Sequence, residues 1–305
     1  MKWIKKGLIY NVDDRISFAT NTAMTPNPFI LKDEEIRVYC AFRDQDGRAR
    51  IGYVDVSQKD PSVILKVSNK PCLDLGAKGM FDDNGVILGD VLRVEDKIYM
   101  YYVGFQHVQN AKFMACSGLA ISSDNGETFE RVKPTPIADR VPNAVFGRCI
   151  HSVLFDEGIF KIWYSVIYGW EYINGIPYPQ YDIRFVESED GIHIKDDDGI
   201  HCIGCQGNEY RIGRPRVTKK APNSYEMRYT FDTRDKEYIA GFATSEDGIH
   251  WKREDEKSGL VKSESGWDGE MACYPVEIET KYGTYLFYDG NGMGATGFGY
   301  AQLEK

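Results

Sequence analysis

The sequence lacks three features that would assign a protein to a broad class at once: long apolar runs, an excess of basic residues and an even set of cysteines. Its apolar runs are short, such as residues 98–103, and fall far below the roughly 20 residues of a membrane helix. It has 37 Lys and Arg against 46 Asp and Glu, a net charge of −9, which excludes broad binding to nucleic acids. Seven scattered cysteines argue against a secreted disulfide framework.

Motifs of several common enzyme classes are also missing. There is no Gly-x-Ser-x-Gly and no Walker pattern, so serine hydrolase and P-loop chemistry have no support. The segment 1–14 has a basic start but neither an apolar stretch of signal-peptide length nor a small-residue cleavage site. We therefore expect a soluble, cytoplasmic protein that does not insert into membranes.

What the sequence has in abundance is aromatic residues, glycine and a repeat. Tyr, Phe and Trp make up 13% of the 305 residues, and there are 30 glycines, a combination that favours strands and tight turns. The repeat is an alternating, aromatic strand pattern, and its five copies, 59 to 65 residues apart, are RVYCAFRD (from Arg37), KIYMYYVG (Lys97), IFKIWYSV (Ile159), SYEMRYTF (Ser224) and GTYLFYDG (Gly283). A second strand-like segment follows each copy, and a third precedes it.

A unit of three or four strands, repeated at this spacing, is the signature of a β-propeller blade. Five blades use the whole chain, so we predict an all-β fold, a five-bladed β-propeller formed by one domain of residues 1–305. The fifth blade ends after its third strand, and the segment KWIKKGLIY (from Lys2) resembles the outer strand of blade four. We therefore expect the N-terminal strand to pair with the last blade and close the ring.

The propeller geometry predicts a polar site at one end of the central channel. The first strand of each blade lines the channel, and its start lies at the same end as the loop between strands two and three. A funnel of carboxylates, cations and amides, rimmed by aromatic faces, suits the hydroxyls and C–H faces of a sugar. One aromatic residue, Trp170, comes from a long loop that we predict in blade three, residues 167–181. The expected substrate-binding residues are Asn27, Arg43, Asp44, Arg148, His151, Trp170, Arg214, Tyr274 and Asn291.

Two stretches stand out beside the blade pattern: FDDNGV (from Phe81) and GWDGEMACYPVEIETKYGTYLFYDGNGMGATGFGYA (from Gly266). Together with the blades they resemble the five-bladed glycoside hydrolase superfamily, which includes families 43, 32 and 68 and the family 130 mannoside phosphorylases. The resemblance covers nearly the whole chain. It implies an acid and a base on either side of an anomeric carbon, or, in a phosphorylase, one acid together with cations that bind phosphate.

The reactive residues of these families do not transfer intact. Asn27 occupies the position of the family 43 base, and an amide cannot take a proton from water. The acid of the phosphorylases lies one residue away from Asp90, which would face the wrong side unless the strand bulges. The catalytic candidates are therefore Asp83, Glu270 and Asp90, and the candidates for binding an anionic group are Arg43, Arg148 and Arg214.

The sequence leaves two functions open. One is a carbohydrate-active enzyme, glycosidase-like or phosphorylase-like, that acts on a glycosidic bond in the channel; its substrate is a carbohydrate, either anionic or accompanied by phosphate. The alternative is a non-hydrolytic sugar- or nucleotide-sugar-binding protein of surface-polysaccharide metabolism. We predict no cofactor and assign no metal ligands, because the G-x-G-x-x-G at 292–297 precedes a strand and the C-x-x-C at 202–205 lacks a second pair. Whether the channel holds a metal stays open. The oligomeric state stays open.

Overall fold

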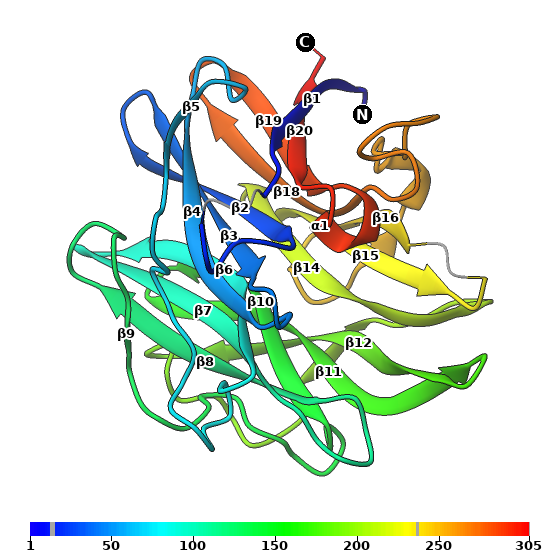
Figure 1. Cartoon of the computed structure of the whole chain (residues 1–305). Helices are drawn as coiled ribbons and strands as arrows, with labels where there is room; N and C mark the ends of the chain where they lie inside the picture. Colours follow the sequence, from blue (N-terminus) through cyan, green and yellow to red (C-terminus); the bar gives the residue numbers. More distant parts are fainter. Residues whose placement is uncertain (13–15, 236–237, 305) are drawn as a thin grey trace.

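Five four-stranded antiparallel sheets form a ring, as the sequence predicts (Figure 1). The structure is a computed structural model that describes residues 1–12, 16–235 and 238–304. The first strand of each blade contacts the first strands of its two neighbours, so the five inner strands enclose the channel. The aromatic repeat of the sequence forms the second strand of each blade, whose pleated surface is packed on both sides.

The strands of blades 1 to 4 follow one another outwards in chain order, and blade 5 takes its outer strand from the N-terminus. Blade 1 contains β2 (Ala23–Lys32), β3 (Glu35–Arg43), β4 (Ala49–Ser57) and β5 (Ile64–Val67). Blade 2 contains β6 (Gly85–Val94), β7 (Lys97–Gln106), β8 (Met114–Ser122) and β9 (Glu130–Arg131). Blade 3 contains β10 (Gly147–Asp156), β11 (Ile159–Ile173), β12 (Ile176–Ser188) and β13 (Ile200–Ile203). Blade 4 contains β14 (Glu209–Ala221), β15 (Ser224–Thr233), β16 (Tyr238–Ser245) and β17 (Lys252–Arg253). Blade 5 contains β18 (Cys273–Thr280), β19 (Gly283–Asp289), β20 (Phe298–Leu303) and β1 (Trp3–Tyr10). Two short helices of the described residues lie outside the sheets: η1 (Asp255–Lys257) and α1 (Asn291–Gly294).

The ring closes through the pairing of the two ends of the chain. Strand β1 runs antiparallel to β20, with Trp3 opposite Leu303 and Tyr10 opposite Phe298. Figure 1 shows the first strand, in blue, beside the last one, in red. The pairing covers the edge that β20 would otherwise expose, and it confirms the predicted closure.

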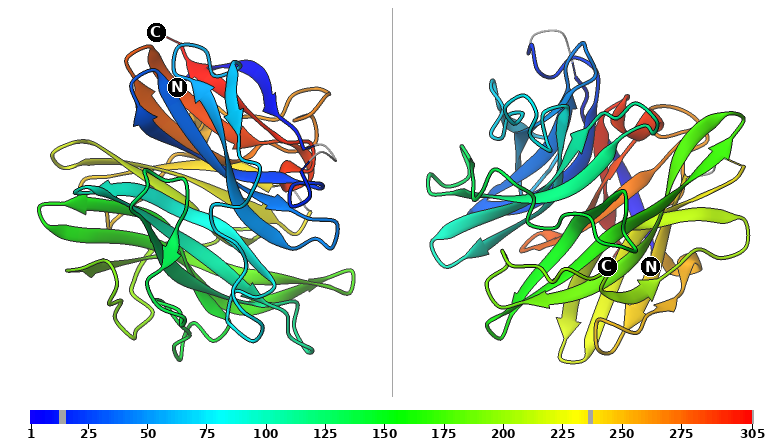
Figure 2. Two further views of the ribbon diagram at one scale, coloured as in Figure 1. Left: turned by 60° about the vertical axis from the view of Figure 1, so that its left-hand side comes forward. Right: turned by 90° about the horizontal axis from the view of Figure 1, so that it is seen from below.

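The hydrophobic core is divided among the interfaces between neighbouring blades, which pack face to face around the ring (Figure 2). Between blades 3 and 4, for example, the fully buried Trp163 packs near Tyr229 and donates from Nε1 to the carbonyl oxygen of Gly248 at 2.7 Å. Burying one such large side chain contributes about 1.5–3 kcal/mol. Each blade is therefore stabilised by both of its neighbours.

The segment 167–181 is a β-hairpin, so the loop predicted there is wrong. Strands β11 and β12 continue past the other blades' strands, with residue pairs running from Ile167–Tyr181 to Ile173–Ile176. The turn is Asn174–Gly175, and both residues have positive φ angles, 52° and 78°. Asn-Gly is the preferred sequence for such a two-residue turn.

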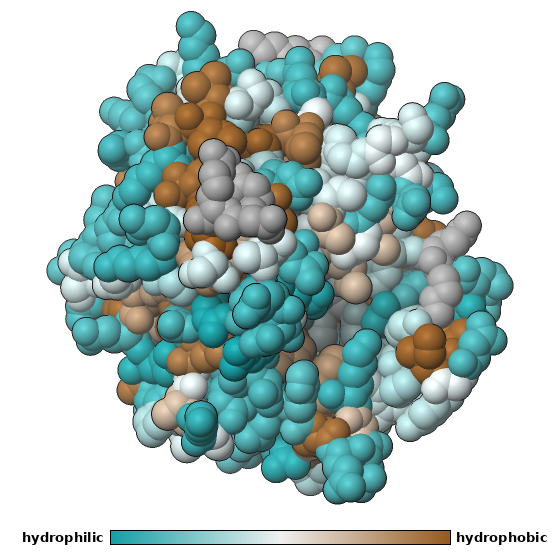
Figure 3. All heavy atoms as spheres, viewed as in Figure 1, coloured by the Kyte–Doolittle hydropathy of each residue, from teal (hydrophilic) through white to brown (hydrophobic). Residues whose placement is uncertain are grey.

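The face of the molecule seen in Figure 3 carries mostly hydrophilic residues, with hydrophobic ones in separate patches. Across the described part of the chain, every helix is too short or too polar to cross a membrane. All seven cysteines are free thiols, and five of them are buried.

Candidate functional site in the propeller channel

A β-bulge interrupts the channel-lining strand of every blade at an equivalent place. The bulges lie at residues 25–26 of β2, 89 of β6, 151 of β10, 214–215 of β14 and 274–275 of β18. Three bulged residues, Thr25, Arg214 and Tyr274, have φ angles of 56°, 52° and 53°. A bulge redirects the side chains that follow it, so these five irregularities decide which residues face which part of the channel.

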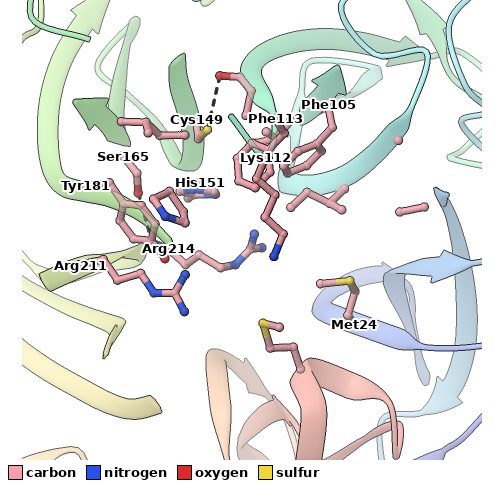
Figure 4. A pocket seen from close by; sticks show the side chains of 18 of the residues that line it. Met24, Phe105, Lys112, Phe113, Cys149, His151, Ser165, Tyr181, Arg211 and Arg214 are labelled. Atoms are coloured by element: carbon pink, nitrogen blue, oxygen red, sulfur yellow. Dashed lines mark hydrogen bonds between the residues drawn. The ribbon is translucent and has the colours of Figure 1, made fainter. Parts of the chain in front are cut away.

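Two cavities lie along the channel, one on each side of the bulges. The first cavity has a volume of about 330 Å³ and is lined by the starts of the inner strands and by nearby loops (Figure 4). The second cavity has a volume of about 230 Å³ and is lined by later residues of the same five strands. Since the inner strands all start at one end of the ring, the two cavities belong to opposite ends of the channel. The first is within the size range of small-molecule sites.

Tyrosine rings form one wall of the first cavity. Tyr181 comes from β12, Tyr238 from the start of β16 and Tyr274 from the bulge of β18. Their hydroxyl oxygens form a chain, 3.3 Å from Tyr181 to Tyr238 and 2.9 Å from Tyr238 to Tyr274. Burial raises the pKa of Tyr238 and of Tyr274 above the usual value. The hydroxyls of Tyr238 and Tyr274 therefore stay protonated and present donors and acceptors beside apolar ring faces.

A second group of aromatic rings lies across the cavity. Phe105 and Phe113 line it and contact each other edge to face, with their ring centres 5.1 Å apart. Trp170, on the β11–β12 hairpin, packs edge to face behind Phe113 at 5.3 Å and near Phe146 at 6.0 Å. Trp170 is not among the residues that line the cavity, and its ring supports the wall from outside.

Basic side chains reach the same space. Figure 4 shows Lys112, Arg211 and Arg214 directed towards the middle of the cavity. The Nη2 of Arg211 lies 2.6 Å from a carboxylate oxygen of Asp232, which also accepts a hydrogen bond from Tyr210. Tyrosine rings surround the Arg211 guanidinium with centres 5.0–5.9 Å away. The charge of Arg211 is thus balanced within the protein, and its position is fixed.

Arg214 is placed differently. Its Nη2 donates to the carbonyl oxygen of Leu88 at 2.9 Å, and its Cζ lies 4.9 Å from the ring centre of Tyr274. The charge of Arg214 acts on the buried Asp289, whose two carboxyl oxygens accept from the backbone N–H of Thr25. Burial raises the pKa of Asp289 well above its usual value, although the Thr25 hydrogen bond and Arg214 act in the opposite direction. Arg214 forms no ion pair with a carboxylate among the described residues, so its charge has no direct counter-ion there.

His151 completes the inner end of the first cavity. It is 5% exposed, and its Nδ1 is buried with no hydrogen-bond partner among the described residues. Burial, followed by the charges of Arg214 and Arg216, lowers the pKa of His151 well below its usual value. The imidazole is therefore neutral, with one ring nitrogen free to bind a ligand hydroxyl or water.

The structure brings four of the predicted substrate-binding residues together in the first cavity: Arg43, His151, Arg214 and Tyr274. Three others use their side chains to fix backbone segments. Asp44 accepts from two N–H groups of its own turn and from Arg50. Buried Arg148 donates to the carbonyl oxygens of residues 139, 195 and 197. Asn291 accepts from the N–H groups of residues 270 and 271.

Asn27 and Asp90 lie in the second cavity, away from His151, Arg214 and Tyr274. The bulge at Gly89 turns Asp90 into the channel. The bulge needs a glycine, because a side chain at residue 89 would bring its Cβ to 2.4 Å from the carbonyl oxygen of Ile150. The sequence predicts that the starts of all five inner strands contribute to one site. The bulges instead divide these residues between two cavities.

Asp90 is the centre of a hydrogen-bond network there. One of its oxygens accepts from Arg216 at 2.8 Å, Asn27 at 3.2 Å and the N–H of Val91 at 2.9 Å. The other accepts from the N–H of Val153 at 2.7 Å. These contacts connect blades 1, 2, 3 and 4 across the channel.

Asp83 and Glu270 stand near the first cavity without lining it. Asp83 directly precedes the lining residues 84 and 85, and its Oδ2 accepts from the N–H of Gly79 at 2.8 Å. Its Oδ1 is buried with no hydrogen-bond partner among the described residues. Glu270 is exposed, in the loop that Asn291 holds just before β18. No carboxylate is present among the described residues that line this cavity.

Several lining residues were not among the predicted site residues. Lys112 and Phe113 precede β8 and Tyr238 is the first residue of β16, so all three lie in or next to a connection between strands two and three, the position from which Arg43 was predicted. Met293 comes from the glycine-rich segment 292–297, which forms the connection between β19 and β20. Loop position was the available signal for these residues, since none belongs to a recognisable motif.

Comparison with solved structures defines the class of the fold. A structure described as a glycoside hydrolase superimposes with a TM-score of 0.72 at 15% identity, covering 98% of this chain and 91% of that one. A thermostable family-43 glycoside hydrolase gives a TM-score of 0.65 at 17% identity, covering 96% and 91%. The chain thus has the five-bladed fold of the glycoside hydrolase superfamily that its sequence resembles.

Sequence comparison gives the family. The chain is 32% identical over 306 residues to the uncharacterized protein Rv1502 of Mycobacterium tuberculosis, and the match covers the full length of both. The chain belongs to the family of Rv1502. No known protein-family profile matches it.

Proposed function

We propose that this protein is carbohydrate-active and that it binds a sugar in the first cavity. The observation that supports this proposal is the composition of the cavity wall. Apolar faces of Phe105, Tyr181 and Tyr274 border a space of about 330 Å³ that also contains hydroxyl, imidazole and guanidinium groups. Sugars need both kinds of contact, because their C–H faces stack on rings while their hydroxyls need paired donors and acceptors. The shared fold with glycoside hydrolases agrees with this assignment.

As an enzyme, the protein would act on a glycosidic bond at the mouth of the first cavity. Asp83 and Glu270 are acids in the approaches to β6 and β18, near that mouth. Either would serve as proton donor or base if a bound substrate reached it. Phosphate, in the phosphorylase version of this reaction, would bind near Arg43 and Arg214. Asp90 is the third catalytic candidate, and its contacts with Arg216 and Val153 favour a structural role.

One observation favours the second candidate function, a sugar-binding protein without hydrolytic activity. The described lining residues of the first cavity provide cations, hydroxyls and a neutral histidine but no carboxylate. Glycoside hydrolysis ordinarily needs two carboxyl groups within reach of the anomeric carbon. A protein of surface-polysaccharide metabolism that binds a sugar or nucleotide-sugar would need none.

A panel experiment separates these functions. Neutral and acidic monosaccharides, nucleotide-sugars and nitrophenyl glycosides are tested for binding by isothermal titration calorimetry and for cleavage, with and without phosphate. The enzyme proposal predicts turnover that falls at least 100-fold in Asp83→Ala or Glu270→Ala and is unchanged in the exposed control Asp96→Ala. Binding without turnover favours the binding protein. Neither binding nor turnover across the panel would contradict the carbohydrate proposal itself.

A further inference from the structure

The charge of the first cavity is opposite to that of the whole chain. The protein has a net charge of −9, yet the cavity is lined by four basic side chains and, among the described lining residues, by no acidic one. Such a local excess of one sign, inside walls of low dielectric constant, concentrates ligands of the other sign. The four basic residues are Arg43, Lys112, Arg211 and Arg214.

The four charges are not equally available. Arg211 is paired with Asp232 at 2.6 Å and enclosed by tyrosine rings, so it shapes the wall more than it attracts a ligand. Arg214 is 8% exposed and points into the cavity, with one nitrogen on a backbone carbonyl oxygen. Lys112 is exposed at the mouth, with its Nζ 6.0 Å from the ring centre of Tyr178. Arg214 therefore lies at the inner end and Lys112 at the entrance.

Two buried side chains that the charge of Arg214 influences, His151 and Asp289, bear on its role. His151 carries a buried Nδ1 without a hydrogen-bond partner among the described residues, so one more hydrogen bond can form at this depth. Asp289 is fully buried, does not line the cavity and forms no ion pair with Arg214. A desolvated guanidinium that lacks a carboxylate partner gains most from a ligand that brings one.

We propose that the first cavity selects a sugar that carries a negative charge, a carboxylate or a phosphate, and that Arg214 binds this group with Lys112 and Arg43 beside it. This inference rests on the proposed carbohydrate function and names its substrate class. The sugar ring lies against the Tyr181 and Tyr274 side of the cavity, and a hydroxyl of the sugar bonds to Nδ1 of His151. A charge-assisted hydrogen bond of this kind corresponds to about 10- to 100-fold in affinity.

The test compares charged sugars with their neutral counterparts on the full chain. Glucuronate is titrated against glucose, galacturonate against galactose, and glucose 6-phosphate against glucose, with inorganic phosphate alone as a further probe. We expect at least one charged sugar to bind 10-fold or more tightly than its neutral partner and to weaken as salt rises. Tighter binding of a uronate than of its neutral sugar identifies a carboxylate as the charged group of the ligand. Tighter binding of glucose 6-phosphate than of glucose and of inorganic phosphate identifies a phosphorylated sugar.

Two variants locate the effect. Arg214→Met removes the inner charge and is expected to abolish the preference, while Lys112→Ala, at an exposed position that does not threaten folding, is expected to reduce it several-fold. Arg93→Met, an exposed arginine on blade 2, is the matched control and leaves the preference unchanged. Equal binding of charged and neutral sugars would overturn this inference and leave the carbohydrate function standing. Binding of inorganic phosphate as strong as that of every sugar would overturn it too, and the absence of any sugar binding would remove both.

Discussion

The replacement Asp90→Asn separates a structural role of Asp90 from a catalytic one. Its carboxylate accepts four hydrogen bonds, three on one oxygen and one on the other, and pairs with the guanidinium of Arg216 at 2.8 Å. An asparagine has one acceptor oxygen and one NH₂ group. The donors that now bind one of the two carboxylate oxygens would therefore face the NH₂ group, which is itself a donor. The buried charge of Arg216 would also lose its counter-ion. Burial already lowers the pKa of Arg216 to about 10.

The expected cost is large. Removing one partner of a buried ion pair destabilises a protein by about 3–5 kcal/mol, and we take the lower value because the asparagine retains one acceptor. For a chain of this size, roughly 2 °C of melting temperature correspond to each kcal/mol, so the melting temperature should fall by roughly 6 °C. Urea denaturation and calorimetry measure both quantities.

The matched control is Asp96→Asn, an exposed residue in the turn after the same strand, which should change stability by less than about 0.5 kcal/mol. The double variant Asp90→Asn with Arg216→Met should regain part of the loss, because it removes the unpaired charge. Unchanged stability in Asp90→Asn, combined with loss of turnover on a glycoside, would refute this reasoning and return Asp90 to the role of reacting acid.

Three further replacements test the packing and the ion pairs of the ring. Trp3→Ala, on the strand that closes the ring, should cost about 3–5 kcal/mol in urea denaturation, since it empties a buried site. Arg37→Met should cost about 3–5 kcal/mol because it leaves Asp55, 2.7 Å away, buried and unpaired. Burial alone would raise the pKa of Glu127, but hydrogen bonds from Tyr53 and Arg37 lower it to about 2. The stability that this carboxylate contributes is fully present above the pKa of Glu127 in the unfolded chain, and it is lost as the pH falls from about 4.5 to about 2. Glu127→Gln should flatten that part of the pH profile of stability.

Each replacement has a partner that should leave stability nearly unchanged. Ile4→Ala removes a 37% exposed side chain next to Trp3 on the same strand. Arg93→Met removes an exposed arginine, and Glu130→Gln an exposed carboxylate close to Glu127. Equal effects in variant and control would contradict the packing and pairing described for Trp3 and Arg37. An unchanged pH profile in Glu127→Gln would contradict its lowered pKa.

The fold was predictable because its signals are periodic. Each blade repeats an alternating strand pattern, and alternation states directly which side chains pack between neighbouring blades. The closing strand was predictable too, because Lys2–Tyr10 has the composition of an outer strand and the last blade lacked one. The blade 3 hairpin was missed, although Asn174–Gly175 between two runs of tyrosine, tryptophan and isoleucine is a strong turn signal.

The site was predictable only in part because its geometry depends on bulges. A bulge shifts the register by one residue and sends the following side chains to the other side of the strand. Nothing in the residue types of Thr25, Arg214 or Tyr274 favours a positive φ, so the division of the channel could not be deduced from spacing. Arg148 shows a second limit: two of its partners are carbonyl oxygens 47 and 49 residues away, and only the folded loop brings them near.

The bulges also explain why the two cavities differ in chemistry. Around them, Arg214 reaches from blade 4 to the carbonyl oxygen of Leu88 on blade 2, and Arg216 reaches from the same strand to Asp90. These two contacts occupy the middle of the channel and lie between the cavities. On one side, the charge of Arg216 is satisfied by an acid of the protein; on the other, Arg214 forms no ion pair with a described carboxylate and faces the open first cavity. The same inner strand thus uses one arginine to hold the ring together and presents the other to the open first cavity.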